Sequence, residues 1–357
     1  MTDVRSWQVP GRVNLVGEHL DYNGGPVLPM AVDKHLTIKA RPRDDDQVRV
    51  WSQFGTATFT TSVQPGEVDG WAALTAGVVW ASASAGPAGG VDLVIESEIP
   101  DGAGLSSSAA TACGVTMALA ELAGRTLTPH EVAAIARRAE NDYLGVPVGV
   151  MDQLAVVHDG ASLVDTRDLS VTPVEVGWGD AGLSLVVIDT NVKHSLAASE
   201  YAVRHDECVR AAGTLGLTWL AEAGPDAVLR FDDADVLKKR VRHVVTETTR
   251  VRGAVRAIAA GDWSQLGTIF TSSHASLRDD FEVSCAELDA AVEAALEGGA
   301  LGARMTGGGF GGSAIALAPT AMLLGLREKV VAAFADHDWT PPTLFTVRPT
   351  AGAHRLT

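Results

Sequence analysis

The sequence predicts an α+β fold of two lobes, rich in strands at first and in helices later. Several short stretches before residue 66 alternate apolar and polar residues with a period of two, as half-buried strands do. Four long stretches after residue 198 instead repeat apolar residues at helical spacing. The chain has 357 residues, more than one hydrophobic core usually organises, so two closely packed lobes are expected.

The first half of the chain alternates strand patterns with turns before it becomes helical. Thr128 suits an N-cap, Pro129 the first helical position and Glu131 the third position of a capping box. A helix is therefore expected from there to about Tyr143. The elements expected before it are strands at 36–40, 48–51 and 56–60 in an antiparallel or mixed sheet, a helix at 71–83, a strand at 91–97 and a helix at 106–122.

The second half begins with a buried strand over 183–190 and continues with helices. A glycine-rich turn is expected from Gly302 to Gly312, just before another strand. The elements expected here are helices at about 199–212, 235–260, 263–278 and 285–298, a strand at 313–317, a helix at 321–336 and a strand at 343–347.

Composition limits the classes of partner and compartment. With 28 basic and 44 acidic residues, the formal charge is −16, which disfavours nucleic acid and anionic membranes. The N-terminal residues lack the pattern of a signal peptide, and no apolar run has the length of a membrane helix. Cys113, Cys208 and Cys285 are odd in number and widely spaced, which favours reduced, buried thiols. A soluble cytoplasmic protein is therefore expected, with no nucleic-acid or membrane partner.

The stretch Pro100–Ala110 lies between the expected strand at 91–97 and the following helix. Gly102 and Gly104 let the backbone turn tightly, and Ser106, Ser107 and Ser108 then open the helix. Free N–H groups and the positive end of the helix dipole bind anions there. The pattern suits the phosphates of a nucleotide triphosphate. An ordinary glycine turn with a serine N-cap remains an alternative.

Polar side chains are dense between Pro10 and Gly25. Arg12, Glu18, His19 and Asp21 lie among glycines there. Paired carboxylate acceptors suit the hydroxyls of a sugar, whereas the spacing is not specific for a metal. A polar surface loop remains the alternative for this stretch.

Two further stretches carry candidate chemistry. Asp152 lies in the otherwise apolar run 148–157, where a carboxylate is either paired or functional, and Arg12 is its candidate partner. The run 304–312 holds five glycines around Phe310, typical of a backbone that approaches a ligand closely. The chain lacks both the Walker P-loop and the protein-kinase motifs.

Taken together, these stretches resemble the motifs of the GHMP small-molecule kinases and, among them, the galactokinase family. Residues 11–23 are similar to the galactokinase signature, 100–110 to the ATP-phosphate loop, and 302–312 to the third motif of the superfamily. The stretches 199–204 and 273–280 resemble galactokinases specifically. These matches follow the family order from residue 10 to about 315.

The resemblance implies the two-lobed GHMP kinase fold with its active site in the cleft between the lobes. The N-terminal lobe, residues 1–180, would resemble domain 2 of ribosomal protein S5 and hold the ATP-phosphate loop. Residues 181–357 would form an α/β C-terminal lobe. The implied reaction is ATP-dependent phosphorylation of the C1 hydroxyl of α-D-galactose, which gives galactose 1-phosphate and ADP and begins galactose use. The implied ligands are galactose and Mg-ATP, with Mg²⁺ as cofactor, on a monomer.

The resemblance also assigns roles to individual residues. Leu20 stands where a threonine is more familiar, and the residues after Trp71 depart from the usual pattern. The positions that match are Asp152 and Arg12 as catalytic residues, Glu18, His19, Asp21, Gly149, Asp152 and Tyr201 for the sugar, Gly102, Gly104, Leu105, Ser106, Ser107, Ser108 and Trp71 for ATP, and Ser108 and Glu140 for Mg²⁺.

Other functions remain open at this point. A sibling enzyme could phosphorylate N-acetylgalactosamine or arabinose on the same scaffold. A non-catalytic sensor could bind galactose and ATP to engage a regulatory protein, but such relatives lack part of the serine–alanine stretch, which is whole at 106–110.

Overall fold

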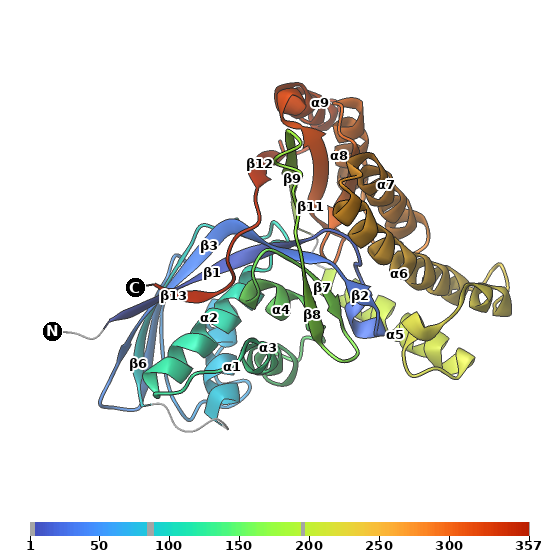
Figure 1. Ribbon diagram of the computed structural model, residues 1–357. Coiled ribbons are helices and arrows are strands. Elements are labelled where there is room, and N and C mark those ends of the chain that lie inside the picture. The colour runs from blue at the N-terminus through green and yellow to red at the C-terminus, as the bar shows by residue number, and fades with distance from the viewer. Residues whose placement is uncertain (1–3, 84–88, 194–196, 357) are drawn as a thin grey trace.

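The computed structural model describes residues 4–83, 89–193 and 197–356. Within these ranges, nine strands form one sheet and four form a second (Figure 1). In the first sheet β4 pairs with β6 in parallel and the other pairs are antiparallel, so the mixed sheet expected from the sequence is confirmed. Its main path is β13 (His354–Leu356), β1 (Arg5–Asn14), β3 (Pro29–Pro42), β6 (Val91–Ser97), β4 (Gln47–Ser52) and β5 (Gly55–Thr60).

Three short strands and the second sheet complete the strand layout. The short strands β2 (Pro26–Val27), β7 (Ala161–Asp165) and β8 (Ser170–Val174) extend the first sheet beside β3. The second sheet has the order β10 (Gly302–Thr306), β11 (Gly311–Pro319), β9 (Leu183–Lys193) and β12 (Thr343–Val347), all antiparallel. The chain changes sheets between Val174 and Leu183, and β13 returns to the first sheet. The division at residue 180 stays a prediction.

Four helices lie on one face of the first sheet (Figure 1). α2 (Ser107–Leu122) and α4 (Met151–Val157) contact β1 and β3, while α1 (Ala73–Ser82) and α3 (Pro129–Arg138) pack against α2. α2 comes very close to the sheet, because a Cβ on Gly114 would lie 2.8 Å from Val9. The predicted capping box of Thr128 and Glu131 is confirmed, and α3 continues into a π-helical turn over Ala139–Tyr143.

Within the described part of the chain, two helices cover the second sheet directly, and the other helices pack on these two or on one another. α7 (Trp263–Asp279) and α8 (Ala286–Glu297) contact its strands, α9 (Leu323–Ala335) packs on α8, α6 (Val236–Ala260) on α7, and α5 (Ala197–Leu215) on α6. In the described residues no helix is both long and apolar enough to cross a membrane. Short 3₁₀ turns occur at Asp21–Asn23, Gly70–Ala72, Leu220–Glu222, Pro225–Arg230 and Thr320–Met322.

One alternative that the sequence left open is excluded, and one expectation from the sequence was wrong. The stretch from Pro10 is not a surface loop at its start, because β1 continues to Asn14 with both faces buried. The glycine-rich turn does not begin at Gly302, because 302–306 form β10, a fully buried strand paired with β11. In both places burial on two sides removes the alternation that marks a half-buried strand. The turn itself is confined to the residues between β10 and β11.

Candidate active site

The predicted pairing of Arg12 with Asp152 is confirmed. Arg12 lies on β1 and Asp152 in the first turn of α4, and Arg12 donates from Nε to Oδ1 at 2.8 Å and from Nη2 to Oδ2 at 2.9 Å. Such a bidentate pair fixes the plane of the carboxylate. The arginine side chain is buried, whereas that of Asp152 is 32% exposed. The carboxylate is therefore held rigidly and still accessible.

Ser106 brings the phosphate loop to the same carboxylate. It is the N-cap of α2, in a left-handed conformation (φ 56°, ψ 45°), and its hydroxyl caps no N–H of the helix. Instead, Oγ donates to Asp152 Oδ2 at 2.6 Å. The N–H groups of the first turn of α2 therefore keep their capacity to bind an anion.

The other loop residues shape the turn. Gly102 and Gly104 have positive φ, as expected for a tight turn, and the Gly104 carbonyl accepts from Arg12 Nη1. Leu105 is buried, and its carbonyl accepts from the N–H of Arg12 at 3.1 Å. The structure thus places Leu105 in the core behind the loop and not on the surface of a pocket.

A polar pocket opens next to the Arg12–Asp152 pair. It gathers the predicted catalytic, sugar-contact and metal residues from segments far apart in the sequence. Its lining includes Arg12, Glu18, His19, Asp21, Ser108, Glu140, Gly149, Met151, Asp152, Gln153, Tyr201, Gly307 and Gly308. Glu18 and His19 are almost fully buried, so this stretch is not the polar surface loop that the sequence left open. We call this cavity the sugar-side pocket, after the sugar-contact residues that the sequence predicts.

Gly149 leaves room for Asp21, because a Cβ at position 149 would lie 1.6 Å from the carboxylate of Asp21 and would displace that side chain. Burial, followed by the nearby charge of Asp152, raises the pKa of Asp21 to about 6. The carboxylates of Asp21 and Asp152 thus face the same pocket, together with those of Glu18 and Glu140. Leu20, the departure from the family pattern, is fully buried in the core and does not line the pocket.

The imidazole of His19 is held as one neutral tautomer. Burial, followed by the nearby His243, lowers its pKa to about 3. Its Nε2 lies 3.2 Å from the carbonyl of Gly308, which can only accept, so Nε2 carries the proton. Nδ1 therefore accepts from the hydroxyl of Tyr22 at 2.9 Å. The ring of Tyr201 packs beside His19, with ring centroids 5.3 Å apart.

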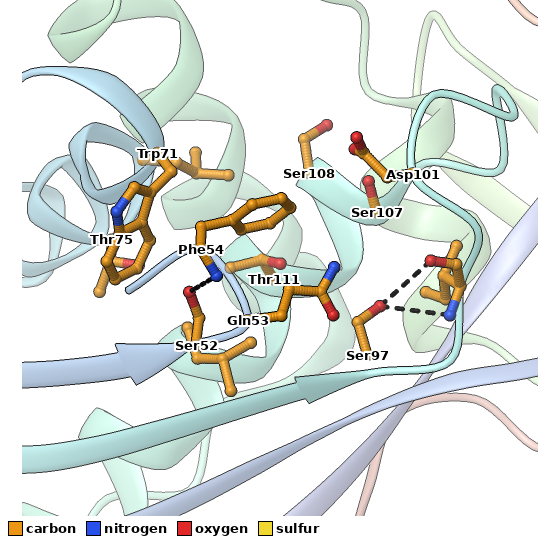
Figure 2. Close-up of a pocket in the computed structure, with 13 residues that line it drawn as sticks. Ser52, Gln53, Phe54, Trp71, Thr75, Ser97, Asp101, Ser107, Ser108 and Thr111 are labelled. Carbon is orange, nitrogen blue, oxygen red and sulfur yellow. Dashed lines mark hydrogen bonds between the residues drawn. The ribbon is translucent and has the colours of Figure 1, made fainter. Parts of the chain in front are cut away.

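A second, more apolar pocket adjoins the first at Ser108, which lines both. Figure 2 shows Trp71 and Phe54 at one end and Ser107, Ser108 and Asp101 at the other. The rings of Phe54 and Trp71 tilt toward each other with centroids 6.5 Å apart. An aromatic end and a helix N-terminus suit a nucleoside and its phosphates, respectively. We call this cavity the nucleotide-side pocket.

Oxygen groups that suit Mg²⁺ lie where the pockets meet. Glu140, in the π-helical turn, is buried and accepts from Gln153 Nε2. Burial, opposed in part by Gln153 and Ser108, raises the pKa of Glu140 to about 7. Gln153 Oε1 is buried and has no hydrogen-bond partner in the described structure. Mg²⁺ commonly takes one or two protein oxygens together with substrate phosphates, so these groups fit it. No cluster of three His, Cys, Asp or Glu side chains among the described residues could hold a metal unaided.

Sequence reasoning missed several residues of this region. Phe54 lies at the tip of the β4–β5 hairpin and lines the nucleotide-side pocket. The sequence indicated only that it lies between two predicted strands. Arg304 lies fully buried on β10 and donates to Glu18. Glu247 is fully buried on α6 and accepts from the N–H of Gly17. A charged residue at helical spacing among valines was the available signal for Glu247.

Three family models match the chain. The galactokinase galactose-binding signature matches residues 2–42, the GHMP kinases N terminal domain 73–160, and the GHMP kinases C terminal 254–334. The chain is 42% identical to a galactokinase of Streptomyces coelicolor over 98% of its length and 94% of that protein. It is 38% identical to a galactokinase of Mycobacterium tuberculosis over 98% of both chains.

Solved structures agree with these matches. The galactokinase of Lactococcus lactis complexed with galactose has a TM-score of 0.91 and 33% identity, with 99% of this chain and 95% of that chain covered. The mevalonate kinase of Methanococcus jannaschii shares only the fold, with a TM-score of 0.69, 17% identity and 98% and 99% of the chains covered. These likenesses confirm the α+β, two-lobed fold expected from the sequence.

Proposed function

Because this chain belongs to the galactokinase family of the GHMP kinases, whose reaction is ATP-dependent phosphorylation of galactose, we propose how its two pockets divide that reaction. Galactose occupies the sugar-side pocket, and ATP occupies the nucleotide-side pocket with its phosphates on the start of α2. The observation that carries this assignment is that Ser108 lines both pockets beside the Arg12–Asp152 pair. A phosphoryl group passing from one pocket to the other would cross at that point.

Asp152 is the proposed proton acceptor for the C1 hydroxyl of α-D-galactose. Its carboxylate faces the sugar-side pocket, and Arg12 fixes its orientation from behind. Removal of the proton makes the C1 oxygen a better nucleophile. Because the carboxylate is already fixed by Arg12, it loses little conformational freedom when the transition state forms. Glu18, His19, Asp21 and Tyr201 are the proposed contacts for the rest of the sugar, with Gly149 leaving room for Asp21.

The proposed phosphate cradle consists of the amides from Gly102 to Ser108 and the N-terminus of α2. Phosphoryl transfer depends mostly on positioning and on neutralising negative charge. The helix dipole and the guanidinium of Arg12 supply positive potential next to Ser108. Trp71 and Phe54 would hold the adenine ring at the other end of the nucleotide-side pocket.

Mg²⁺ would be held by Ser108 and Glu140, with Gln153 Oε1 as an adjacent oxygen group. The buried carboxylate of Glu140 holds its proton near neutral pH, and a cation beside it would favour the ionised form. When bound, the ion would neutralise charge on the phosphates.

The proposed assembly is a monomer that works in the cytoplasm. The residues of both pockets come from one chain. Its three cysteines are free thiols, which suits a reducing compartment where ATP is available. Size-exclusion chromatography with light scattering tests the monomer, and a mass of twice 37.2 kDa would contradict it.

The assay that tests this function measures ADP release with Mg-ATP in the presence of galactose, glucose, talose, arabinose and N-acetylgalactosamine. We expect turnover with galactose and a product phosphorylated at C1, identified by NMR. A strong preference for a 2-acetamido sugar or arabinose would replace galactose as the substrate. Binding of sugar and ATP without ADP release would favour a sensor.

The Asp152→Asn variant tests the proton acceptor. The amide keeps the shape of the side chain but cannot take a proton, so kcat should fall by about 10²–10⁴-fold, the usual contribution of a general base. Calorimetric affinities for galactose and for a non-hydrolysable ATP analogue should change little. Asp142→Asn, at an exposed carboxylate in the π-helical turn before α4, is the control and should leave kcat unchanged. Near-normal turnover of Asp152→Asn would refute the assignment.

A further inference from the structure

A buried polar stripe runs along α6 behind the sugar-side pocket. Arg240, His243 and Glu247 follow one another at spacings of three and four residues, so they share one face of the helix. Each is at most 1% exposed. Buried polar side chains are nearly always hydrogen-bonded, so the partners of these residues show which parts of the structure they connect.

Glu247 joins α6 and α7 to the turn that carries the sugar contacts. Its Oε1 accepts from the N–H of Gly17 at 2.9 Å and from Ser273 Oγ at 2.7 Å, and its Oε2 accepts from Arg250 Nε at 2.6 Å. Gly17 has φ 112° and no side chain, so Glu247 holds this turn through the backbone N–H of Gly17. Burial alone would raise the pKa of Glu247, but Arg250 foremost brings it down to about 2, so the residue is a carboxylate.

A second buried pair connects Glu247 with Glu18. Arg304 Nη2 donates to Glu18 Oε2 and lies 3.9 Å from Glu247 Oε1. The N–H of Gly307 donates to the other oxygen of Glu18 at 3.1 Å. The two carboxylates are thus balanced by the guanidinium groups of Arg304 and Arg250. Removal of one charge from such a set leaves another uncompensated in the interior.

His243 lies one turn before Glu247, and its side chain contacts the backbone of the Gly17–His19 turn. Its Nε2 lies 3.2 Å from the carbonyl of Glu18, and its Nδ1 hydrogen-bonds with Ser276 Oγ at 3.0 Å. Ser273 and Ser276 belong to the stretch 273–280, which resembles galactokinases but lines neither pocket. Its serines bind the α6 stripe instead.

We propose that Glu247 is a positioning residue for the sugar-side pocket, which fixes the Gly17–His19 turn from α6 without touching the sugar. The inference rests on the proposed function. From α6, Glu247 restrains the backbone at Gly17 and His243 restrains the carbonyl of Glu18. Glu247 also lies 3.9 Å from Arg304, which binds the carboxylate of Glu18. The contacts offered to galactose therefore depend on this helix. A contribution to stability alone would not call for an ionised group, because apolar residues of similar volume replace buried ion pairs at little cost.

The Glu247→Gln variant tests the proposal by comparing the two substrates. The glutamine oxygen can still accept from Gly17 and Ser273, but its NH₂ group would face the N–H of Arg250 and the charge is lost. We expect the KM for galactose to rise at least about tenfold, which equals about 1.4 kcal/mol, and the KM for ATP to stay within about threefold. Calorimetric titration with galactose alone should show the same loss.

Two further variants distinguish a loss of galactose affinity from a general loss of stability. Ser273→Ala removes one donor to Glu247 and should raise the KM for galactose in the same direction by a smaller factor. Leu237→Ala empties a buried position ten residues, about 15 Å, along the same helix. It should lower the unfolding temperature without changing the ratio of the two KM values.

Each outcome decides the proposal. A selective loss of galactose affinity in Glu247→Gln and Ser273→Ala supports it. Equal changes in both KM values, an unchanged KM for galactose in Ser273→Ala, or the same selectivity in Leu237→Ala would overturn it. The wild-type protein separates the two levels of inference, because absence of galactose phosphorylation there contradicts the proposed function, whereas active wild type with unaffected variants contradicts only the role of Glu247.

Discussion

At the scale of single residues, Glu140 shows how a functional group opposes stability. Its pKa rises from 4.5 to about 7, mainly through burial. Between these values the folded protein keeps a proton that the unfolded chain has released, so the free energy of unfolding falls as pH increases through this window. Above pH 7 the folded state bears the full cost, about 3 kcal/mol for a shift of this size.

Glu140→Gln should therefore be more stable than the wild type at high pH. Without Mg²⁺, the difference in unfolding temperature should be small at pH 5, grow through pH 7 and level off by pH 8.5, as measured by calorimetry. The Mg²⁺ concentration for half-maximal activity should rise. Glu328→Gln, at an exposed carboxylate, should show no pH-dependent difference. A constant gain at all pH values in Glu140→Gln would contradict the explanation.

The sequence indicated the pairing of Arg12 with Asp152 because a carboxylate in an apolar run needs a partner. It did not indicate that Ser106 donates to that carboxylate. The direction of the hydroxyl depends on a left-handed backbone conformation and on the approach of α4. Both are set by tertiary contacts, whereas composition and spacing describe only the local chain.

At the scale of elements, α7 and β10 meet backbone to backbone at two glycines. A Cβ on Gly267 would lie 2.2 Å from the carbonyl oxygen of Leu301, and one on Gly302 would lie 2.0 Å from the carbonyl oxygen of Gly267. Neither backbone can yield without moving its element. This contact sets the distance between the helix layer and the second sheet.

Gly267→Ala should destabilise the protein by about 2 kcal/mol or more, because overpacking against backbone forces a shift. Urea unfolding of the variant and of Gly213→Ala provides the measurement. Gly213 lies on α5, and a methyl group added there would have nothing within 4 Å, so alanine at this position should be neutral or stabilising by up to about 1 kcal/mol. Equal stability of the two variants would show that the α7–β10 contact is not tight.

Element positions were predictable where one face of the element meets solvent. The helices α6 and α7 begin and end within a few residues of their expected bounds, because their polar faces leave a helical period in the sequence. The strands β1 and β10 were missed. They are buried on both sides and carry Arg12 and Arg304, so neither alternation nor uniform hydrophobicity marks them.

At the scale of the whole molecule, the last strand of the first sheet comes from the far end of the sequence. β13 pairs with β1 at Ser6–Gln8, a stretch that includes the fully buried Trp7, and it lies next to β1 at the edge of the sheet (Figure 1). The site-bearing end of β1, from Gly11 to Asn14, pairs with β3. The residues of β1 that pair with β13 are therefore separate from those that carry the site.

Removal of the chain from His354 onward should lower the unfolding temperature while the KM values for galactose and ATP stay the same. The edge of β1 would lose its partner, but Gly11–Asn14 would keep theirs. Differential scanning calorimetry and steady-state kinetics on the truncated protein provide the measurements. A changed KM for galactose would show that the two halves of β1 are coupled.

The α+β class and the two lobes were predictable, since strand patterns and helical patterns occupy different parts of the chain. The pairing of β13 with β1 was not. All three of its residues are exposed, so the strand has no burial pattern for the sequence to reveal. Long-range pairing of this kind follows from how the second lobe returns the chain to the first.

The return of β13 also constrains the order of events during synthesis. β1 is among the first strands to leave the ribosome, and β13 is translated only after the whole second sheet and its helices. Until then β1 presents unpaired N–H and C=O groups along Ser6–Gln8, the kind of edge that invites pairing between nascent chains. The growing polypeptide is thus open to misassembly at this edge of β1, and a chaperone that covers the edge would have to remain until β13 has left the ribosome.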